Sequence, residues 1–266
     1  MPPQWNVMTV EPIAERPSSA AESKGGDFPF YNGEPTTIDG KQWWAVLGLV
    51  VLAFGVLVVG SLLTPNPFLL LAPAVLFVAI PLYGLARITP QHWRQLFRPF
   101  SGRVVLSMVG YTFLTMGLSL AIGLIVLVTY GANPNPVITI LQDSNYFELS
   151  LFLLRTLPQL MGEEVLTILP FLALLTYFYS HLKWSHKRAV LVAWLLSSLW
   201  FGLLHLPTYQ GNLVQSIFVV GGARMVLTFA YIRTKNLWVS TGAHILYDWI
   251  LILTALALLN LEQSIQ

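Results

Sequence analysis

The sequence predicts an all-α, polytopic membrane protein of about seven to eight transmembrane helices. Hydrophobic residues make up 55% of the 266 positions and charged residues only 10%, and the mean hydropathy is +0.67. The apolar residues fall into blocks long enough to cross a bilayer as helices, which takes about 20 residues each. The charged residues gather in short joints between these blocks, as is typical of membrane proteins with several spans.

The first 41 residues differ from the rest because they are rich in proline, serine, glycine and acidic groups. Such a segment buries too little apolar surface to fold on its own. We therefore expect residues 1–41 to form a disordered cytoplasmic tail and residues 42–266 to form an integral membrane domain.

The apolar blocks predict seven spans in order along the chain. Their expected limits are 43–63, a second span ending near 86, 104–130, a fourth within 147–180, 189–205, 213–232 and 237–259. Residues 64–67 predict a tight turn, and residues 131–145, which contain two Asn-Pro steps and no Lys or Arg, predict an external loop. Pro158 and Pro170 interrupt the fourth block, which could be one kinked span or two short ones. We interpret it as one span.

Basic residues set the expected orientation. They concentrate in the joints 87–103, 181–188 and 233–235, which the positive-inside rule places in the cytoplasm together with the amino terminus. We expect a multi-pass protein of a bacterial cell membrane. The net charge of +2 is too small to suggest a nucleic-acid partner, and the lack of cysteine excludes disulfides, thiolate catalysis and cysteine-based metal sites.

Two adjacent carboxylates, Glu163 and Glu164, lie inside the fourth apolar block. A charge at the centre of a bilayer costs about 2.5 to 3.5 kcal/mol even on insertion scales, so such carboxylates usually face a protein interior or a water-filled cavity. A carboxylate in contact with water can act as a general base. The pair is therefore the first candidate for catalytic chemistry.

The later spans contain further ionisable side chains, among them His205, Arg224, His244 and Asp248. His244 and Asp248 are four residues apart, so on a helix the carboxylate could orient the imidazole ring, and Phe201 precedes His205 by the same spacing. A single histidine at a span end is more often a packed residue, and a single glutamate can simply pair helices. Two glutamates, two histidines and an aspartate on three spans are a stronger signal, since chance rarely gathers them.

These residues resemble the motifs of the CPBP family, the CAAX protease and bacteriocin-processing enzymes, also called the Abi family of intramembrane endopeptidases. The family's motifs are Glu-Glu-x-x-x-Arg, Phe-x-x-x-His, and His-x-x-x-Asn or a similar residue. The matching positions, in the same order, are Glu163-Glu164, Phe201 to His205, and His244 to Asp248. The resemblance covers about residues 161–250, so we place the peptidase-like motifs within about 146–260 of the membrane domain.

Two positions depart from the family pattern. Ile168 stands where the first motif has arginine, and Asp248 stands where the third motif commonly has asparagine. A buried arginine needs a carboxylate partner. We hypothesise that Arg224 supplies the missing positive charge from a neighbouring span.

The resemblance implies a glutamate-type endopeptidase that cleaves a membrane-associated peptide or protein within the bilayer. In the mechanism that it suggests, Glu163 is the general base on a water molecule, and Glu164 shares hydrogen bonds with it. His205 helps to hold the water or the glutamate, while His244, oriented by Asp248, stabilises the oxyanion. Spacing alone does not decide which glutamate is the base.

Two alternatives stay open on the sequence. A zinc-dependent membrane peptidase could use His205, His244 and a glutamate as ligands, but the chain lacks the compact His-Glu-x-x-His signature, so we expect no metal or other cofactor. A catalytically silent scaffold or regulator with the same fold is suggested by Ile168.

The predicted spans place the two motif histidines at different depths. His205 lies near the outer end of its span, whereas His244 lies in the inner third of the last span. Straight helices would keep them apart. Broken or tilted helices near Pro207 and Gly242 would bring them together, because irregular backbone is tolerated where it lines a cavity.

Overall fold

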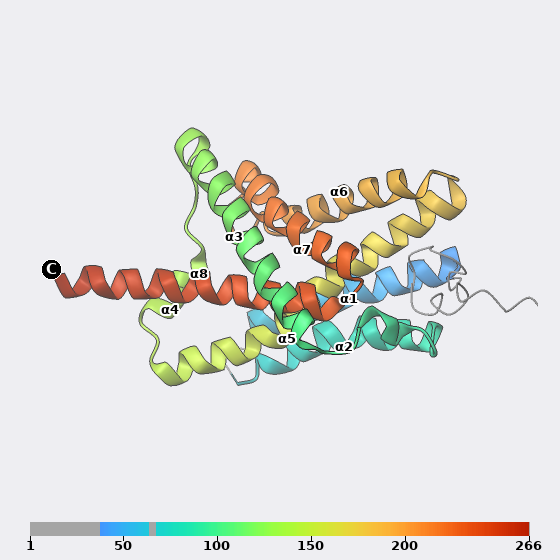
Figure 1. Ribbon diagram of the computed structural model, residues 1–266. Helices are drawn as coiled ribbons and strands as arrows, with labels where there is room; N and C mark the ends of the chain where they lie inside the picture. Colours follow the sequence, from blue (N-terminus) through green and yellow to red (C-terminus); the bar gives the residue numbers. More distant parts are fainter. Residues whose placement is uncertain (1–37, 64–67, 266) are drawn as a thin grey trace, which may run out of the picture.

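The computed structural model describes residues 38–63 and 68–265, and every regular element in these ranges is a helix (Figure 1). The long and short α-helices are α1 (Gly40–Leu63), α2 (Leu71–Ile88), α3 (Gly102–Tyr130), α4 (Pro136–Gln142), α5 (Tyr146–Thr176), α6 (His186–Leu204), α7 (Gly221–Thr234) and α8 (Leu237–Ile265). A 3₁₀ segment, η1 (Trp93–Leu96), and two π-helical segments, η2 (Tyr177–His181) and η3 (Gln215–Val220), complete the described elements. The predicted all-α class is confirmed, whereas residues 1–37 of the expected tail and the expected turn at 64–67 lie outside the described residues.

Within the described residues, 7 helical segments are long and apolar enough to cross a membrane. They are Gly40–Leu63, Leu71–Ile88, Gly102–Tyr130, Tyr146–His181, His186–Leu204, Gln215–Thr234 and Leu237–Ser264. Each overlaps one expected span. The fourth runs without a break for 36 residues, so the apolar block around the glutamates is one span, as the sequence analysis assumed. The protein is an integral, multi-pass membrane protein.

Helix α5 lies at the centre of the molecule, between the α1–α2 pair and the later helices (Figure 1). It begins with a capping box: the Asn145 side chain accepts the Glu148 N–H at 3.0 Å, and the Glu148 carboxylate accepts the Asn145 N–H at 3.0 Å. Further along, nearly all side chains from Leu160 to Thr176 are buried or half-buried. A central helix of this kind can present its polar side chains only to other helices, which makes it the scaffold of the site.

The expected loop 131–145 contains a short helix, α4, that the sequence analysis did not predict. Asn135 caps it, accepting the Val137 N–H at 3.0 Å, and Pro136 is its first residue. Proline is favoured at the first helical position because its fixed φ suits the helix and its missing N–H is not needed there. The Asn-Pro step that was taken as a loop signal is therefore a helix start.

Two glycines let the helices that contain the second and third motifs lie close to other helical segments. A Cβ on Gly202 of α6 would lie 2.6 Å from the Ser216 carbonyl oxygen in η3, and a Cβ on Gly242 of α8 would lie 2.5 Å from Met108 Sδ in α3. Small residues at membrane helix interfaces let backbones approach in this way. The second motif is thereby held against η3 and the third against α3.

Candidate active site

Helix α5 presents its two adjacent glutamates to different surroundings. The Glu164 side chain is 0% exposed, whereas that of Glu163 is 15% exposed. Successive helical residues point about 100° apart, so one carboxylate enters the packed interior and the other reaches a partly open space. Only Glu163 of the pair is accessible to water.

The buried carboxylate of Glu164 is held by two cationic or polar groups from other helices. Arg224 Nη2 of α7 donates to Glu164 Oε1 at 2.5 Å, and His244 Nδ1 of α8 lies 2.9 Å from the same oxygen. The Arg224 side chain is also 0% exposed, and its guanidinium carbon lies 4.9 Å from the centroid of the Phe201 ring, a cation–π distance. Buried charges are tolerated when they are paired and hydrogen-bonded, so Glu164 ties α5, α7 and α8 together.

His244 occupies the middle of the cluster. Since a carboxylate is an acceptor, the Nδ1 atom that contacts Glu164 is the donor, and Nε2 is left facing the opposite side. Nε2 lies 3.9 Å from Glu163 Oε2 and 3.9 Å from Asp248 Oδ1. Both distances exceed hydrogen-bond length. The ring is therefore oriented by Glu164, while Asp248, the orienting residue that the sequence suggested, lies beyond hydrogen-bonding distance.

His205 is the first residue after α6, and its ring packs on Phe201. The ring centroids of Phe201 and His205 are 4.6 Å apart, those of Phe201 and His244 are 6.3 Å apart, and His205 Nδ1 lies 2.9 Å from the Phe201 carbonyl oxygen. The Asp248 carboxylate is 31% exposed. Phe201 thus lies between the two histidines, which the span limits had placed at different depths.

The helix limits show where the backbone is irregular near the two histidines. Helix α6 ends at Leu204, three residues before Pro207, whereas α8 continues without a break through Gly242. Of the two irregular places that the sequence suggested, only the one before Pro207 is a helix end. After α6 the chain forms a turn that includes Tyr209.

Two residues that the sequence analysis did not select lie near Glu163. Gln159 Nε2 donates to Glu163 Oε1 at 3.3 Å. Tyr209 lies in the turn between α6 and η3, where burial and the carboxylates of Asp248 and Glu163 raise the pKa of its hydroxyl. The spacing of four residues could have identified Gln159, but no sequence signal marks Tyr209, because its position depends on how the turn folds.

Ile168, which stands at the arginine position of the first motif, is 1% exposed and belongs to the apolar core. An arginine at that position would have no room for a hydrated charge. The cation next to the motif is Arg224 instead, as the compensation hypothesis requires. Whether this contact supports activity stays a prediction.

The arrangement of the side chains that could bind a metal does not favour the zinc alternative. In the part of the chain that the structure describes, no three His, Asp or Glu side chains come close enough together to hold a metal ion. A catalytic zinc site needs three such ligands at about 2.0–2.2 Å. The expectation that no metal is required stays a prediction.

The comparisons with known proteins agree with the motif resemblance. Residues 145–250 match the family model described as type II CAAX prenyl endopeptidase Rce1-like. The matched segment contains all three motifs and the whole Glu164 cluster. Searches of curated proteins and of solved structures gave no match. This similarity to a family of endopeptidases covers the segment 145–250, which is less than half of the chain.

Proposed function

We propose that this protein is an intramembrane endopeptidase that hydrolyses a membrane-associated peptide or protein with water activated by Glu163. The proposal rests on the difference in side-chain exposure between the two glutamates. Glu164 is enclosed and paired with Arg224, whereas Glu163 is partly exposed and 3.9 Å from His244 Nε2. A general base must reach a water molecule, and only Glu163 meets that requirement.

The proposed reaction begins when Glu163 takes a proton from water while the water oxygen bonds to the substrate carbonyl carbon. In the proposed reaction His244 is protonated on both ring nitrogens from the start, so its Nε2–H donates to the oxyanion that forms on the carbonyl oxygen. The C–N bond then breaks, and the proton held by Glu163 passes to the leaving amine. Glu164 keeps His244 in place through its contact with Nδ1.

The remaining motif residues support this reaction. His205, packed on Phe201, helps to position the water or Glu163, and Asp248 lies beside His244 Nε2 on the substrate side. Arg224 neutralises Glu164. We propose no metal and no other cofactor, and the partners are the substrate and the lipid bilayer, with no nucleic acid.

The orientation that we propose has the amino terminus in the cytoplasm of a bacterial cell. Nine of the 14 lysines and arginines lie in, or within three residues of, the joints between α2 and α3, α5 and α6, and α7 and α8. The positive-inside rule places these joints in the cytoplasm. The turn with Tyr209 then lies on the outer side of the membrane, and Glu163 lies near the middle of its span.

Cleavage assays in liposomes with and without a chelator test the proposal. Wild type is compared with Glu163→Gln, Glu164→Gln and His244→Ala, all reconstituted in equal amounts. Activity that resists the chelator and is lost in the variants supports glutamate catalysis. Chelator-sensitive activity would favour zinc. Ile168 gives the scaffold alternative its support, and a cellular phenotype that survives all three substitutions would establish that alternative.

A further inference from the structure

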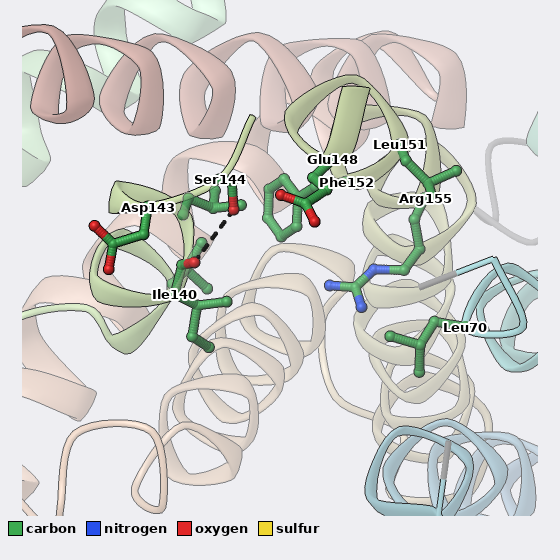
Figure 2. A pocket seen from close by; sticks show the side chains of 10 residues that line it. Leu70, Ile140, Asp143, Ser144, Glu148, Leu151, Phe152 and Arg155 are labelled. Atoms are coloured by element: carbon green, nitrogen blue, oxygen red, sulfur yellow. Dashed lines mark hydrogen bonds between the residues drawn. The ribbon is translucent and has the colours of Figure 1, made fainter. Parts of the chain in front are cut away.

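A second polar feature of α5 lies away from the glutamate cluster, in a cavity of about 510 Å³ between α4 and the first turns of α5 (Figure 2). Its lining is mostly apolar and includes Leu70, Ile140, Leu151 and Phe152. Cavities of this size, with an apolar lining and few polar groups, are typical of sites for small ligands or peptide ends.

Arg155 is the cationic group of this cavity. Figure 2 shows its guanidinium pointing into the open space from α5. Among the described residues it makes no hydrogen bond or ion pair, its Nε is buried without a partner, and its one ring contact is with Phe152 at 5.2 Å. A partly desolvated charge inside an apolar protein is costly without a counter-charge. The cavity is therefore suited to an anionic group.

Two carboxylates also line the cavity, but neither pairs with Arg155 within the described residues. Glu148 accepts the Asn145 N–H at 3.0 Å in the capping box of α5. Asp143 lies on the far side of the cavity, with its carboxylate directed away from Arg155 in Figure 2. The guanidinium stays available to a ligand.

The cavity lies in line with the proposed catalytic base. Arg155, Gln159 and Glu163 follow one another at intervals of four residues on α5, so they share a face of the helix. Gln159, which lies between Arg155 and Glu163 on this face, donates a 3.3 Å hydrogen bond to Glu163. Eight residues of helix rise about 12 Å, which is the length of roughly three to four residues of extended peptide.

We propose that Arg155 binds the free C-terminal carboxylate of the peptide substrate and so sets the cleavage position a few residues before the chain end. This inference rests on the proposed function. An arginine guanidinium forms two parallel hydrogen bonds to a carboxylate, and the apolar lining accommodates the last side chain. A lipid phosphate would offer similar chemistry, but it would not account for the alignment of Arg155 with Glu163.

The test measures binding apart from cleavage. The inactive Glu163→Gln protein, reconstituted in neutral nanodiscs, is titrated with a fluorescent, farnesylated CAAX peptide that ends in a free carboxylate, and with the same peptide ending in a carboxamide. We expect the carboxamide to bind at least about tenfold more weakly, because it lacks the charge-assisted hydrogen bonds. Adding Arg155→Gln should remove this difference, Arg155→Lys should restore part of it, and Arg103→Gln, at an exposed position, should leave it unchanged.

Cleavage by the otherwise wild-type protein gives the second readout. Arg155→Gln should raise KM for the carboxylate peptide at least about tenfold with little change in kcat, because Arg155 is far from the scissile bond. Equal binding of the two peptides would overturn the inference, even if both are cleaved and the proposed function holds. A preference for the carboxylate without any cleavage would retain the Arg155 site and refute the proteolytic function. If the two peptides bind alike, and Arg155→Gln but not Arg103→Gln weakens the binding of fluorescent phosphatidylglycerol, the site binds lipid phosphate and the inference is wrong.

Discussion

Glu164 and Arg224, 60 residues apart in the sequence, form an ion pair in which both side chains are 0% exposed. The pair joins α5 to α7, and the contact of His244 Nδ1 with the same carboxylate oxygen brings in α8. The position of His244 therefore depends on a buried charge that is itself neutralised from a third helix. We therefore expect changes at Glu164 to affect both stability and activity, whereas Glu163 stays outside this arrangement.

Removing one member of the buried pair should destabilise the protein strongly. We expect Arg224→Met or Glu164→Gln to lower the free energy of unfolding by about 3–5 kcal/mol, because an uncompensated buried charge or polar group is left behind. Thermal unfolding in detergent measures this effect. The double variant Glu164→Leu with Arg224→Met should be less damaged than the sum of the single variants, and a strictly additive result would contradict the coupling.

Replacing Asp248 by asparagine should be mild. Its carboxylate lies 3.9 Å from His244 Nε2 and is 31% exposed, so no buried ion pair is lost, and asparagine is the residue that the family commonly has there. We expect Asp248→Asn to keep kcat/KM near the wild-type value and Asp248→Ala to lower it about 10- to 100-fold, the range for residues that position a catalytic group. Equal losses in both variants would show that the charge itself is required.

Gly202→Ala should loosen the contact between α6 and η3. A Cβ at this position would lie 2.6 Å from the Ser216 carbonyl oxygen, a backbone atom that cannot move independently. Overpacking of this kind costs about 1–3 kcal/mol, so thermal unfolding should begin at a lower temperature. Gly117→Ala is the matched control in α3, since a Cβ there meets nothing within 4 Å. Similar unfolding temperatures for the two variants would argue against the close contact.

Tyr209 should make the protein sensitive to alkaline pH. Burial and the carboxylates of Asp248 and Glu163 raise the pKa of its hydroxyl above the ordinary value of 10.0. Above about pH 10 the unfolded chain loses this proton before the folded protein does, so the unfolded state is favoured and stability falls as pH rises. We expect Tyr209→Phe to flatten the alkaline fall of the unfolding free energy, and Tyr146→Phe, at an exposed position, to leave it as it is. An unchanged pH dependence in Tyr209→Phe would place its hydroxyl away from the two carboxylates.

The sequence predicted the spans because hydropathy blocks of about 20 residues and basic joints are local features. The helix limits differ by only a few residues from those expected, and Tyr146–His181 is one span as predicted. Helix α4 was missed, since an Asn-Pro step is equally typical of a turn and of a capped helix start. An Asn-Pro step occurs both in turns and at helix starts, so the local sequence does not distinguish the two.

The candidate site was predictable as a set of residues but not as a geometry. Motif spacing gave Glu163, Glu164, His244 and the others, and charge compensation suggested Arg224. The partner of His244 was not predictable: helical spacing favoured Asp248, yet the hydrogen bond goes to Glu164. That choice depends on how α5 and α8 pack against each other in the folded protein, which the spacing of residues within one helix does not determine.

The central claim is that Glu163 activates the water while Glu164 has a structural role, and the most direct test compares their glutamine variants. Initial rates of peptide cleavage and unfolding temperatures are measured on the same reconstituted samples. We expect Glu163→Gln to lower kcat about 10²- to 10⁴-fold, as the loss of a general base does, with an unfolding temperature close to that of wild type. Glu164→Gln should lower the unfolding temperature as well. Cleavage at nearly the wild-type rate by stable Glu163→Gln protein would contradict the account.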